Sequence, residues 1–397
     1  MNEEKMSRGR TNLILAACSL TMFAVGFSMF KLLPMQAPIQ EYFHINVGAY
    51  GWLNTAQNWF VIIFTVPMGF LVRKMPCKWS MALSFALLFA GSMVQLVTSD
   101  YYVFVIGRML EGGGYGFISL VGNSLTANLV KPGKVGFWIS LQVMIAMVGQ
   151  IIHTRAAAWM LYVQGMSFRT VFWAISLLQL GTFVFWMAGV PASVRVTGNA
   201  AATKPDREQT LRVFRSKSNW LVSIALAIFT MAFVSFSAFV IQYLVIRGME
   251  ANAAAKTYSY TSVFGICAIL GFGWLSDRLG TKRKLAIMSF FAGVVSMLLL
   301  MYLPLQLIMI YVVVMGTLPR SIAGLSNASS VDLAEIPADI PIVNSFRNTV
   351  SQLIGGVLGG ILIGYLIQYA GYPVTIYFLS ISMAAGGICW IFAKKVP

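Results

Sequence analysis

Long apolar runs, separated by short polar segments, repeat from one end of the chain to the other. A helix needs about 20 mostly apolar residues to cross a bilayer. Twelve runs reach roughly this length, and they cover residues 13–33, 50–71, 79–97, 102–125, 135–155, 170–190, 220–246, 257–275, 285–303, 306–328, 346–369 and 373–393. Only 10% of the 397 residues are charged, whereas a soluble domain carries about 25%. The pattern predicts an all-α integral membrane protein with twelve transmembrane helices.

One polar segment is longer than the others and divides the runs into two groups of six. It covers residues 191–218, is charged, and contains few large apolar side chains. Charged segments of this kind behave as extended linkers. The sequence therefore predicts an N-terminal six-helix bundle at residues 1–190 and a C-terminal six-helix bundle at residues 219–397, joined by a cytoplasmic linker.

Short sequences in the first group recur in the second group at a nearly constant offset. FSMF at residues 27–30 matches FSAF at 236–239, and GFLVRK at 69–74 matches GWLSDR at 273–278. The recurrence predicts two pseudo-symmetric halves. Repeats of this kind usually place a substrate site near the bilayer midplane, between the halves.

The net charge of +16 is distributed unevenly across the predicted membrane. With the N-terminus in the cytoplasm, 20 of the 28 basic residues fall on the inner side, three fall on the outer side and five lie within spans. This bias follows the positive-inside rule. It predicts a multi-pass protein of the inner (cytoplasmic) membrane with both termini in the cytoplasm. The basic balance is therefore a topology signal, and nucleic acid is not an expected partner.

Two motifs resemble signatures of one transporter family. The segment GFGWLSDRLGTKRK at residues 271–284 resembles the loop signature of the major facilitator superfamily, through Gly273, Asp277, Arg278 and Gly280. The segment GRMLEGGGYG at residues 107–116 resembles the fourth-span signature of that family, with Arg108 as its arginine. The first-half copy of the loop departs from the pattern, because Arg73 stands where an aspartate is expected.

The resemblance implies a secondary transporter that works by alternating access. In this family two bundles of six helices expose a central cavity to each side of the membrane in turn, and spans 1, 4, 7 and 10 usually line that cavity. The loop residues then serve gating and do not contact substrate. A monomer is the usual state of the family.

Five basic residues lie within the predicted spans, against a single clearly embedded acid. The bases are Lys31, Arg108, Arg155, Arg320 and Arg347, and the acid is Glu111. A charge at the bilayer centre costs about 2.5–3.5 kcal/mol, so each embedded base requires a partner or a task. A bound anion would supply the missing negative charge. We therefore expect transport of a small anion, a carboxylate or a similar oxyanion, by proton symport or anion exchange.

Arg320 is the first candidate for substrate contact, because it lies near the middle of the tenth span and its guanidinium fork suits a carboxylate. Arg347 and Lys31 are further candidates near the ends of their spans. Uncharged polar side chains in other spans are expected to orient the ligand; they are Gln57, Asn58, Gln142, Gln242, Tyr243 and Tyr260. The alternative is that Arg320 is structural and that Arg347 extends to lipid headgroups.

Arg108 and Glu111 are three residues apart, so they share a helix face and can form an ion pair. Glu111 is the candidate proton carrier, because it is the only obvious carboxylate inside a span. By resemblance to the family, Arg108 would assist proton coupling. A purely structural ion pair is the alternative.

Other classes of function are less well supported by the sequence. Efflux of cationic drugs usually needs acidic residues in the cavity, and these are scarce. A neutral solute, such as a sugar or a nucleoside, is possible if the embedded arginines are structural. His44 and His153 are isolated and the four cysteines are scattered, so no catalytic site, metal site or cofactor is expected. The expected partners are a small anion, lipid and, where transport is coupled to them, protons.

Overall fold

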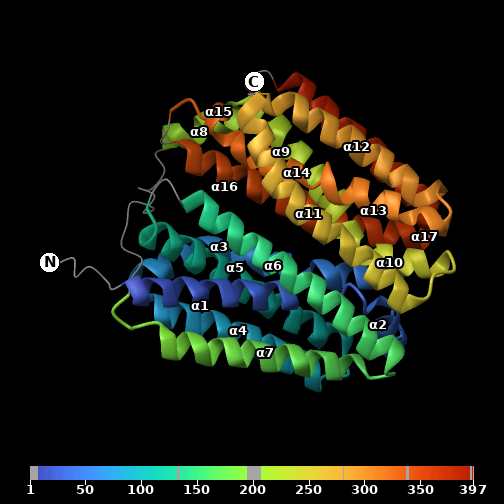
Figure 1. Cartoon of the computed structure of the whole chain (residues 1–397), viewed down its shortest axis with the longest axis horizontal. Coiled ribbons are helices and arrows are strands. Elements are labelled where there is room, and N and C mark those ends of the chain that lie inside the picture. The colour runs from blue at the N-terminus through green and yellow to red at the C-terminus, as the bar shows by residue number, and fades with distance from the viewer. Residues whose placement is uncertain are drawn as a thin grey trace. The chain divides into compact units, whose positions relative to one another are not determined.

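The computed structural model describes residues 8–131, 135–194, 207–279, 281–336, 339–393 and 396 (Figure 1). Within these residues the regular elements are all helices, and no strand is present. Eight helical stretches in the described part are long and apolar enough to cross a membrane. The prediction of an all-α membrane fold is confirmed, and each of the twelve predicted spans coincides with one helix or with consecutive helices.

The first six spans are mostly single helices. They are α1 (Arg8–Met29), α3 (Val47–Lys74), α4 (Cys77–Val97), α5 (Tyr101–Leu129), α6 (Val135–Ala158) and α7 (Phe168–Gly189). A short helix, α2 (Gln36–Phe43), follows α1, and α6 continues into the π-helix η2 (Trp159–Val163). Asp100 starts α5, because its side chain accepts a hydrogen bond from the backbone N–H of Val103 at 2.9 Å, which satisfies a donor that the first turn leaves free.

The second six spans are more often divided. Span seven is α9 (Lys217–Phe229), the π-helix η3 (Thr230–Ser235) and α10 (Phe236–Ile246), and the next two spans are α11 (Ala251–Leu279) and α12 (Lys282–Tyr302). Span ten is η4 (Leu305–Leu307), α13 (Ile308–Thr317), α14 (Ser321–Ala328) and the short α15 (Ser330–Leu333). The last two spans are α16 (Ile340–Val350), the π-helix η6 (Ser351–Leu358) and α17 (Gly359–Phe392). The predicted linker contains one helix, α8 (Arg207–Arg215).

Two of these interruptions have clear causes in the sequence. Pro319 lies between α13 and α14, and proline has no N–H with which to continue the hydrogen-bond ladder of a helix. Gly371 interrupts α17 with φ 79° and ψ 172°, a conformation that is essentially restricted to glycine. The predicted spans 346–369 and 373–393 lie on either side of this glycine.

Contacts between residues divide the chain into two compact units. The first unit comprises residues 1–31 and 59–201, and the second comprises residues 32–58 and 202–397. By its contacts, the first part of α3 therefore belongs to the second unit. The predicted bundle boundaries at residues 190 and 219 follow chain order and stay a prediction.

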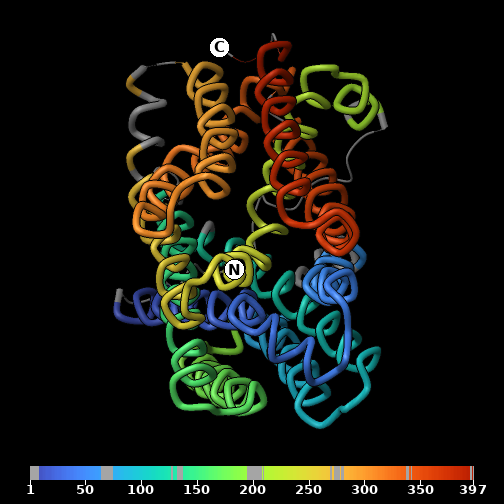
Figure 2. Tube along the Cα trace, turned by 90° about the vertical axis from the view of Figure 1, so that its right-hand side faces the viewer, coloured from blue at the N-terminus to red at the C-terminus, as the bar shows by residue number. Residues whose placement is uncertain are grey.

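Glycines allow close helix packing inside each unit. In the first unit α1 crosses α6, where a Cβ on Gly26 would collide with the carbonyl oxygen of Ala146 and a Cβ on Gly149 would collide with that of Phe23. In the second unit α12 lies beside the last part of α17 (Figure 2). Small residues let helix backbones approach closely inside a membrane, where no hydrophobic force drives helices together.

Candidate functional site

Three charged side chains meet in the interior of the first unit. Lys31 follows the end of α1, and Arg108 and Glu111 lie one turn apart on α5. Nζ of Lys31 is 2.6 Å from Oε1 of Glu111, and Nη1 of Arg108 is 3.0 Å from Oε2. No side chain of the three is more than 1% exposed. The carboxylate is thus shared by two cations, and the cluster keeps one net positive charge.

Helices α1 and α4 form hydrogen bonds with this ion cluster. Ser92 of α4 donates a hydrogen bond to Oε1 of Glu111 at 2.6 Å. Arg108 donates to the backbone carbonyl oxygens of Ser28 at 3.3 Å and Met29 at 2.6 Å. The last carbonyl groups of a helix have no partner within the helix and carry partial negative charge. The end of α1 therefore stabilises the guanidinium of Arg108.

Helix α7 contributes two further contacts to the ion cluster. Gln179 donates to the hydroxyl of Ser28 at 2.9 Å, and its Oε1 lies 3.3 Å from the hydroxyl of Ser92, whose single proton is directed mainly to Glu111. The ammonium group of Lys31 lies 4.0 Å from the centre of the Phe172 ring, within the range of a cation–π contact. Sequence reasoning found the Arg108–Glu111 pair but missed these partners, which lie far away along the chain.

Arg320 lies in the second unit, at the break between α13 and α14, and its surroundings are different. Its Nη2 donates to the hydroxyl of Ser262 on α11 at 3.0 Å. Its Cζ lies 4.2 Å from the centre of the Phe233 ring on η3. Its Nε is buried and has no hydrogen-bond partner. Among the residues that the structure describes, no carboxylate forms an ion pair with Arg320.

Arg347 is also in the second unit, but its donors are occupied. The side chain is fully buried and donates hydrogen bonds to four neutral side chains, those of Asn327, Ser329, Ser330 and Asn344. Helix α16 begins at Ile340, earlier than the predicted start of the span at residue 346. Arg347 consequently lies inside the helix, and its burial shows that it does not extend to lipid headgroups.

The uncharged candidates are divided between the two units. Gln142 of α6 is fully buried in the first unit and donates to the hydroxyl of Thr126 at 2.8 Å. In the second unit the ring of Tyr243 stacks on that of Tyr372, with 4.9 Å between the ring centres. The other candidates in the second unit are Gln57, Asn58, Gln242 and Tyr260. No hydrogen bond in the described part of the chain joins Arg320 to any of these residues, so their role as substrate contacts stays a prediction.

The predicted gating loop is described only in part. Gly273, Asp277 and Arg278 belong to the last turns of α11, which continues to Leu279, beyond the predicted end of the span at residue 275. Arg278 is exposed. The side-chain surroundings of Asp277 and of Gly273, and Gly280 as a whole, lie outside the described residues.

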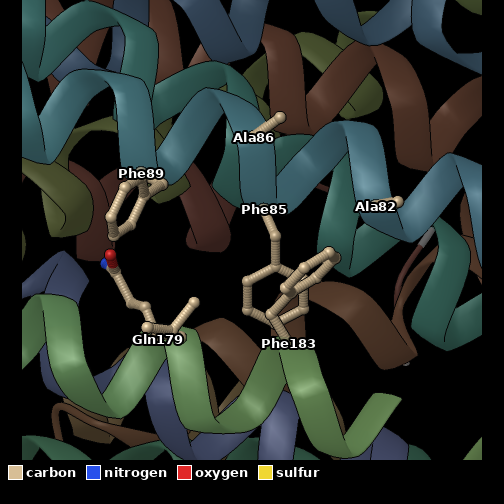
Figure 3. A pocket seen from close by; sticks show the side chains of 7 residues that line it. Ala82, Phe85, Ala86, Phe89, Gln179 and Phe183 are labelled. Carbon is tan, nitrogen blue, oxygen red and sulfur yellow. The ribbon is translucent and has the colours of Figure 1, made fainter. Parts of the chain in front are cut away.

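A cavity of about 180 Å³ lies between α4 and α7 in the first unit (Figure 3). Its walls are apolar and consist of Ala82, Phe85, Ala86, Phe89, Leu180 and Phe183, with Gln179 beside them. Both ends of the Gln179 amide are already engaged by Ser28 and Ser92. The cavity therefore suits hydrocarbon, and it lacks the few well-placed polar groups that orient a polar ligand.

These features define a class of protein. Apolar helices in numbers typical of a transporter surround a buried ion cluster in one unit, and the other unit holds the buried Arg347 and the half-buried Arg320. This arrangement is expected of a polytopic membrane transport protein. A sequence profile of the Major Facilitator Superfamily matches residues 18–353. The chain belongs to the Major Facilitator Superfamily, whose members are secondary transporters.

Solved structures of other transporters share the fold. The nucleoside transporter NupG superposes with a TM-score of 0.78 at 12% sequence identity, over 98% of this chain and 100% of that chain. A bacterial homolog of the human lysosomal transporter Spinster, in an inward-facing and unoccupied conformation, superposes with a TM-score of 0.76 at 14% identity, over 98% of this chain and 96% of that chain. At such identities the similarity concerns the fold alone. No protein of curated function matches the sequence.

Proposed function

We propose that this transporter moves a small anion, a carboxylate or a similar oxyanion, across the inner membrane, with Arg320 as the principal substrate contact. The observation that carries the proposal is the state of the Arg320 guanidinium. A guanidinium has five N–H donors, and within the described part of the chain that of Arg320 makes one hydrogen bond, to Ser262. An uncompensated charge in a membrane interior is costly, and a bound anion would offset that cost.

The other embedded cations support the choice of Arg320 by contrast. Lys31 and Arg108 share the carboxylate of Glu111, and Arg347 is surrounded by four neutral oxygen atoms. Among these four cations, only Arg320 has both a buried nitrogen without a hydrogen-bond partner and no more than one hydrogen bond in the described part of the chain. We assign Lys31 and Arg347 auxiliary roles along the substrate path, together with the uncharged candidates.

We further propose that the ion cluster of the first unit couples transport to protons, with Glu111 as the carrier and Arg108 as its modulator. The cluster is fully buried and holds a carboxylate between two cations, so any gain or loss of a proton there changes the charge of the protein interior. Anion exchange without protons is the competing mode. The positive-inside bias supports cytoplasmic termini for both modes.

Binding and transport measurements on purified protein test the proposed substrate class. A ligand that binds the folded state raises the unfolding temperature by mass action, so a panel of anions and neutral solutes is screened by thermal unfolding and the hits are tested for uptake into proteoliposomes. We expect stabilisation and uptake of one anion class, lost in Arg320→Ala. Arg247→Ala is the matched control, because Arg247 donates to the backbone carbonyl groups of Leu300 and Leu303 and is not a predicted contact. Normal anion uptake by Arg320→Ala would overturn the assignment.

A neutral solute is the second candidate, and the surroundings of Arg347 favour it. Neutral side chains accept the hydrogen bonds of the buried Arg347, so the charge of an arginine in this fold can be stabilised by neutral protein groups. NupG, which has the same fold, is a nucleoside transporter. The panel therefore includes uridine and a hexose. Stabilisation by these solutes, with no response to any anion, would favour the second candidate and make Arg320 a structural residue.

The same proteoliposomes test proton coupling. With an inward proton gradient imposed, we expect faster anion uptake by the wild-type protein. Loss of the carboxylate also destabilises the ion cluster, so uptake is normalised to the folded protein recovered in the proteoliposomes. In that folded fraction Glu111→Gln should abolish the acceleration and leave exchange of internal for external anion. Equal acceleration in both proteins would exclude Glu111 as the carrier.

A further inference from the structure

The charges around Arg320 determine which anions its site can hold. The guanidinium brings one positive charge into the interior of the second unit, and the side chains that the structure gives as its neighbours are neutral. The guanidinium lies over the ring of Phe233, Ser262 accepts its hydrogen bond, and Tyr258 and Tyr311 lie within electrostatic range of it. Neither tyrosine is more than 3% exposed. The site therefore supplies one unit of positive charge and no more.

We propose that Arg320 forms a site for one planar, monovalent oxyanion, such as a monocarboxylate, and that the site rejects divalent anions. This inference rests on the proposed function and narrows its substrate class. A monovalent anion and the guanidinium form a neutral pair. A divalent anion leaves a net negative charge in a poorly solvated interior, where an unpaired charge is strongly disfavoured.

Arg347 does not supply the second positive charge that a divalent anion needs. Asn327, which accepts a hydrogen bond from Arg347, follows Arg320 by seven residues, a helical rise of roughly 10 Å. The guanidinium of Arg347 is also engaged by four neutral side chains. Arg347 would therefore bind an anion at Arg320 only if these hydrogen bonds were broken.

The contact with Phe233 favours a planar ligand. The ring lies 4.2 Å from Cζ of the guanidinium and is itself stacked on Phe229, at 5.3 Å between ring centres and 14° between ring planes, so the aromatic pair occupies one side of the site. The free donors of Arg320 then point outward from the edge of the guanidinium plane. Two parallel N–H groups match the two oxygen atoms of a carboxylate, whereas a halide offers no such pair of acceptors.

A π-helix holds Phe233 in this position. Phe233 lies in η3, and Ser235 of the same segment donates to the carbonyl oxygen of Gly355 in η6 at 2.8 Å. The hydroxyl groups of Thr230 and Ser351 also join the two segments, at 2.6 Å. Short π-helical segments are frequent at functional sites, and two of them brace one wall of this site.

The decisive experiment compares anions of different charge and shape on the purified full-length protein. Sodium acetate, benzoate and nitrate serve as planar monovalent probes, sodium chloride as a spherical one, and sodium succinate and sulfate as divalent ones, all at matched ionic strength. Thermal unfolding and calorimetry report binding. We expect the best planar monovalent probe to bind at least about tenfold more tightly than either divalent probe, and a tenfold ratio corresponds to about 1.4 kcal/mol.

Three variants identify the cause of the selectivity. Arg320→Lys keeps the charge but lacks the fork, so it should retain the preference for monovalent anions and lose the preference for planar ones over chloride. Arg320→Gln should lose binding of all anions. Phe233→Leu, which keeps Arg320, provides a second test if the arginine variants fail to fold, and it should weaken binding of planar anions more than that of chloride.

The outcomes separate this inference from the proposed function. Equal or tighter binding of succinate or sulfate through Arg320 would overturn the monovalent site and leave anion transport intact. Chloride binding as tightly as the planar probes would overturn the planar preference. Anion binding that is unchanged in Arg320→Gln would overturn the site, and a protein that binds no anion would overturn the inference and the proposed function together.

Discussion

The ion cluster of the first unit allows a prediction about stability. The loss in free energy of unfolding should depend on which charge is removed. Wild-type protein buries two cations and one anion, Lys31, Arg108 and Glu111, each at most 1% exposed. Glu111→Gln keeps the size of the side chain but leaves both cations without a counterion. Removing one partner of a buried ion pair costs about 3–5 kcal/mol. We expect a loss of at least this size, because two pairs lose the same carboxylate.

Lys31→Met is the informative counterpart of this change. It removes the excess positive charge and leaves a neutral pair between Arg108 and Glu111, at 3.0 Å. The oxygen atom that Lys31 contacted keeps its hydrogen bond from Ser92 at 2.6 Å, and the methionine side chain can still pack against Phe172. A buried charge in excess of its counterions is costly, and its removal offsets the loss of the Lys31–Glu111 hydrogen bond, so we expect a loss of no more than about 1 kcal/mol.

The double variant Lys31→Met/Glu111→Gln completes the comparison. It restores a single net positive charge but leaves Arg108 without its carboxylate, so its stability should lie between those of the two single variants. Intrinsic fluorescence of the ten tryptophans reports unfolding of the purified protein in detergent or in lipid nanodiscs. Unfolding of Glu111→Gln at the wild-type temperature, or equal losses in both single variants, would refute the reasoning from charge.

Three further substitutions test other parts of the structure. Arg347→Lys cannot reproduce the planar set of donors, and it should destabilise the protein by about 1.5–3 kcal/mol for each charged hydrogen bond lost, measured as a lower unfolding temperature. Gly149→Leu should prevent the close approach of α1 and α6 and reduce the yield of folded protein in size-exclusion chromatography, whereas Gly181→Leu on α7, where a Cβ meets nothing within 4 Å, should be tolerated. Gly371→Ala should lower the free energy of unfolding by about 1–3 kcal/mol through backbone strain. Steric collision adds nothing, because the new Cβ would meet no atom nearer than 3.7 Å. An unchanged free energy of unfolding in chemical denaturation would mean that another backbone conformation is available at this residue.

The number and order of the spans could be predicted from the sequence because the bilayer imposes a length and a hydropathy on each of them. The internal irregularities could not. Three consecutive elements form span seven, and a π-helix begins at Thr230 within an unbroken apolar run. Nothing in the hydropathy of that run distinguishes α-helical from π-helical turns. Helix α16 starts at Ile340, before the predicted span, and hydropathy does not indicate this start because Asn344, Ser345, Arg347 and Asn348 interrupt its apolar pattern.

The candidate site could be predicted only where its members are close in sequence. Arg108 and Glu111 are three residues apart, and their pairing follows from helix geometry. Lys31 reaches the same carboxylate from 80 residues away, and a single sequence contains no signal for that contact. The difference between Arg320 and Arg347 could not be predicted for the same reason. Whether the N–H donors of each arginine are occupied depends on residues from several helices.

Among the described residues Arg320 has no counterion, and this has an electrical consequence. Moving one elementary charge across a membrane changes its energy by about 2.3 kcal/mol for each 100 mV. If the cargo is a monovalent anion, the loaded site is neutral and the empty site carries one positive charge. Anion exchange would then proceed through the neutral, loaded state alone, and membrane voltage would spare it. In proton symport the bound proton restores the positive charge of the loaded protein, so voltage would act on both the loaded and the empty step, and the dependence of uptake on the cell's membrane potential would distinguish the two modes.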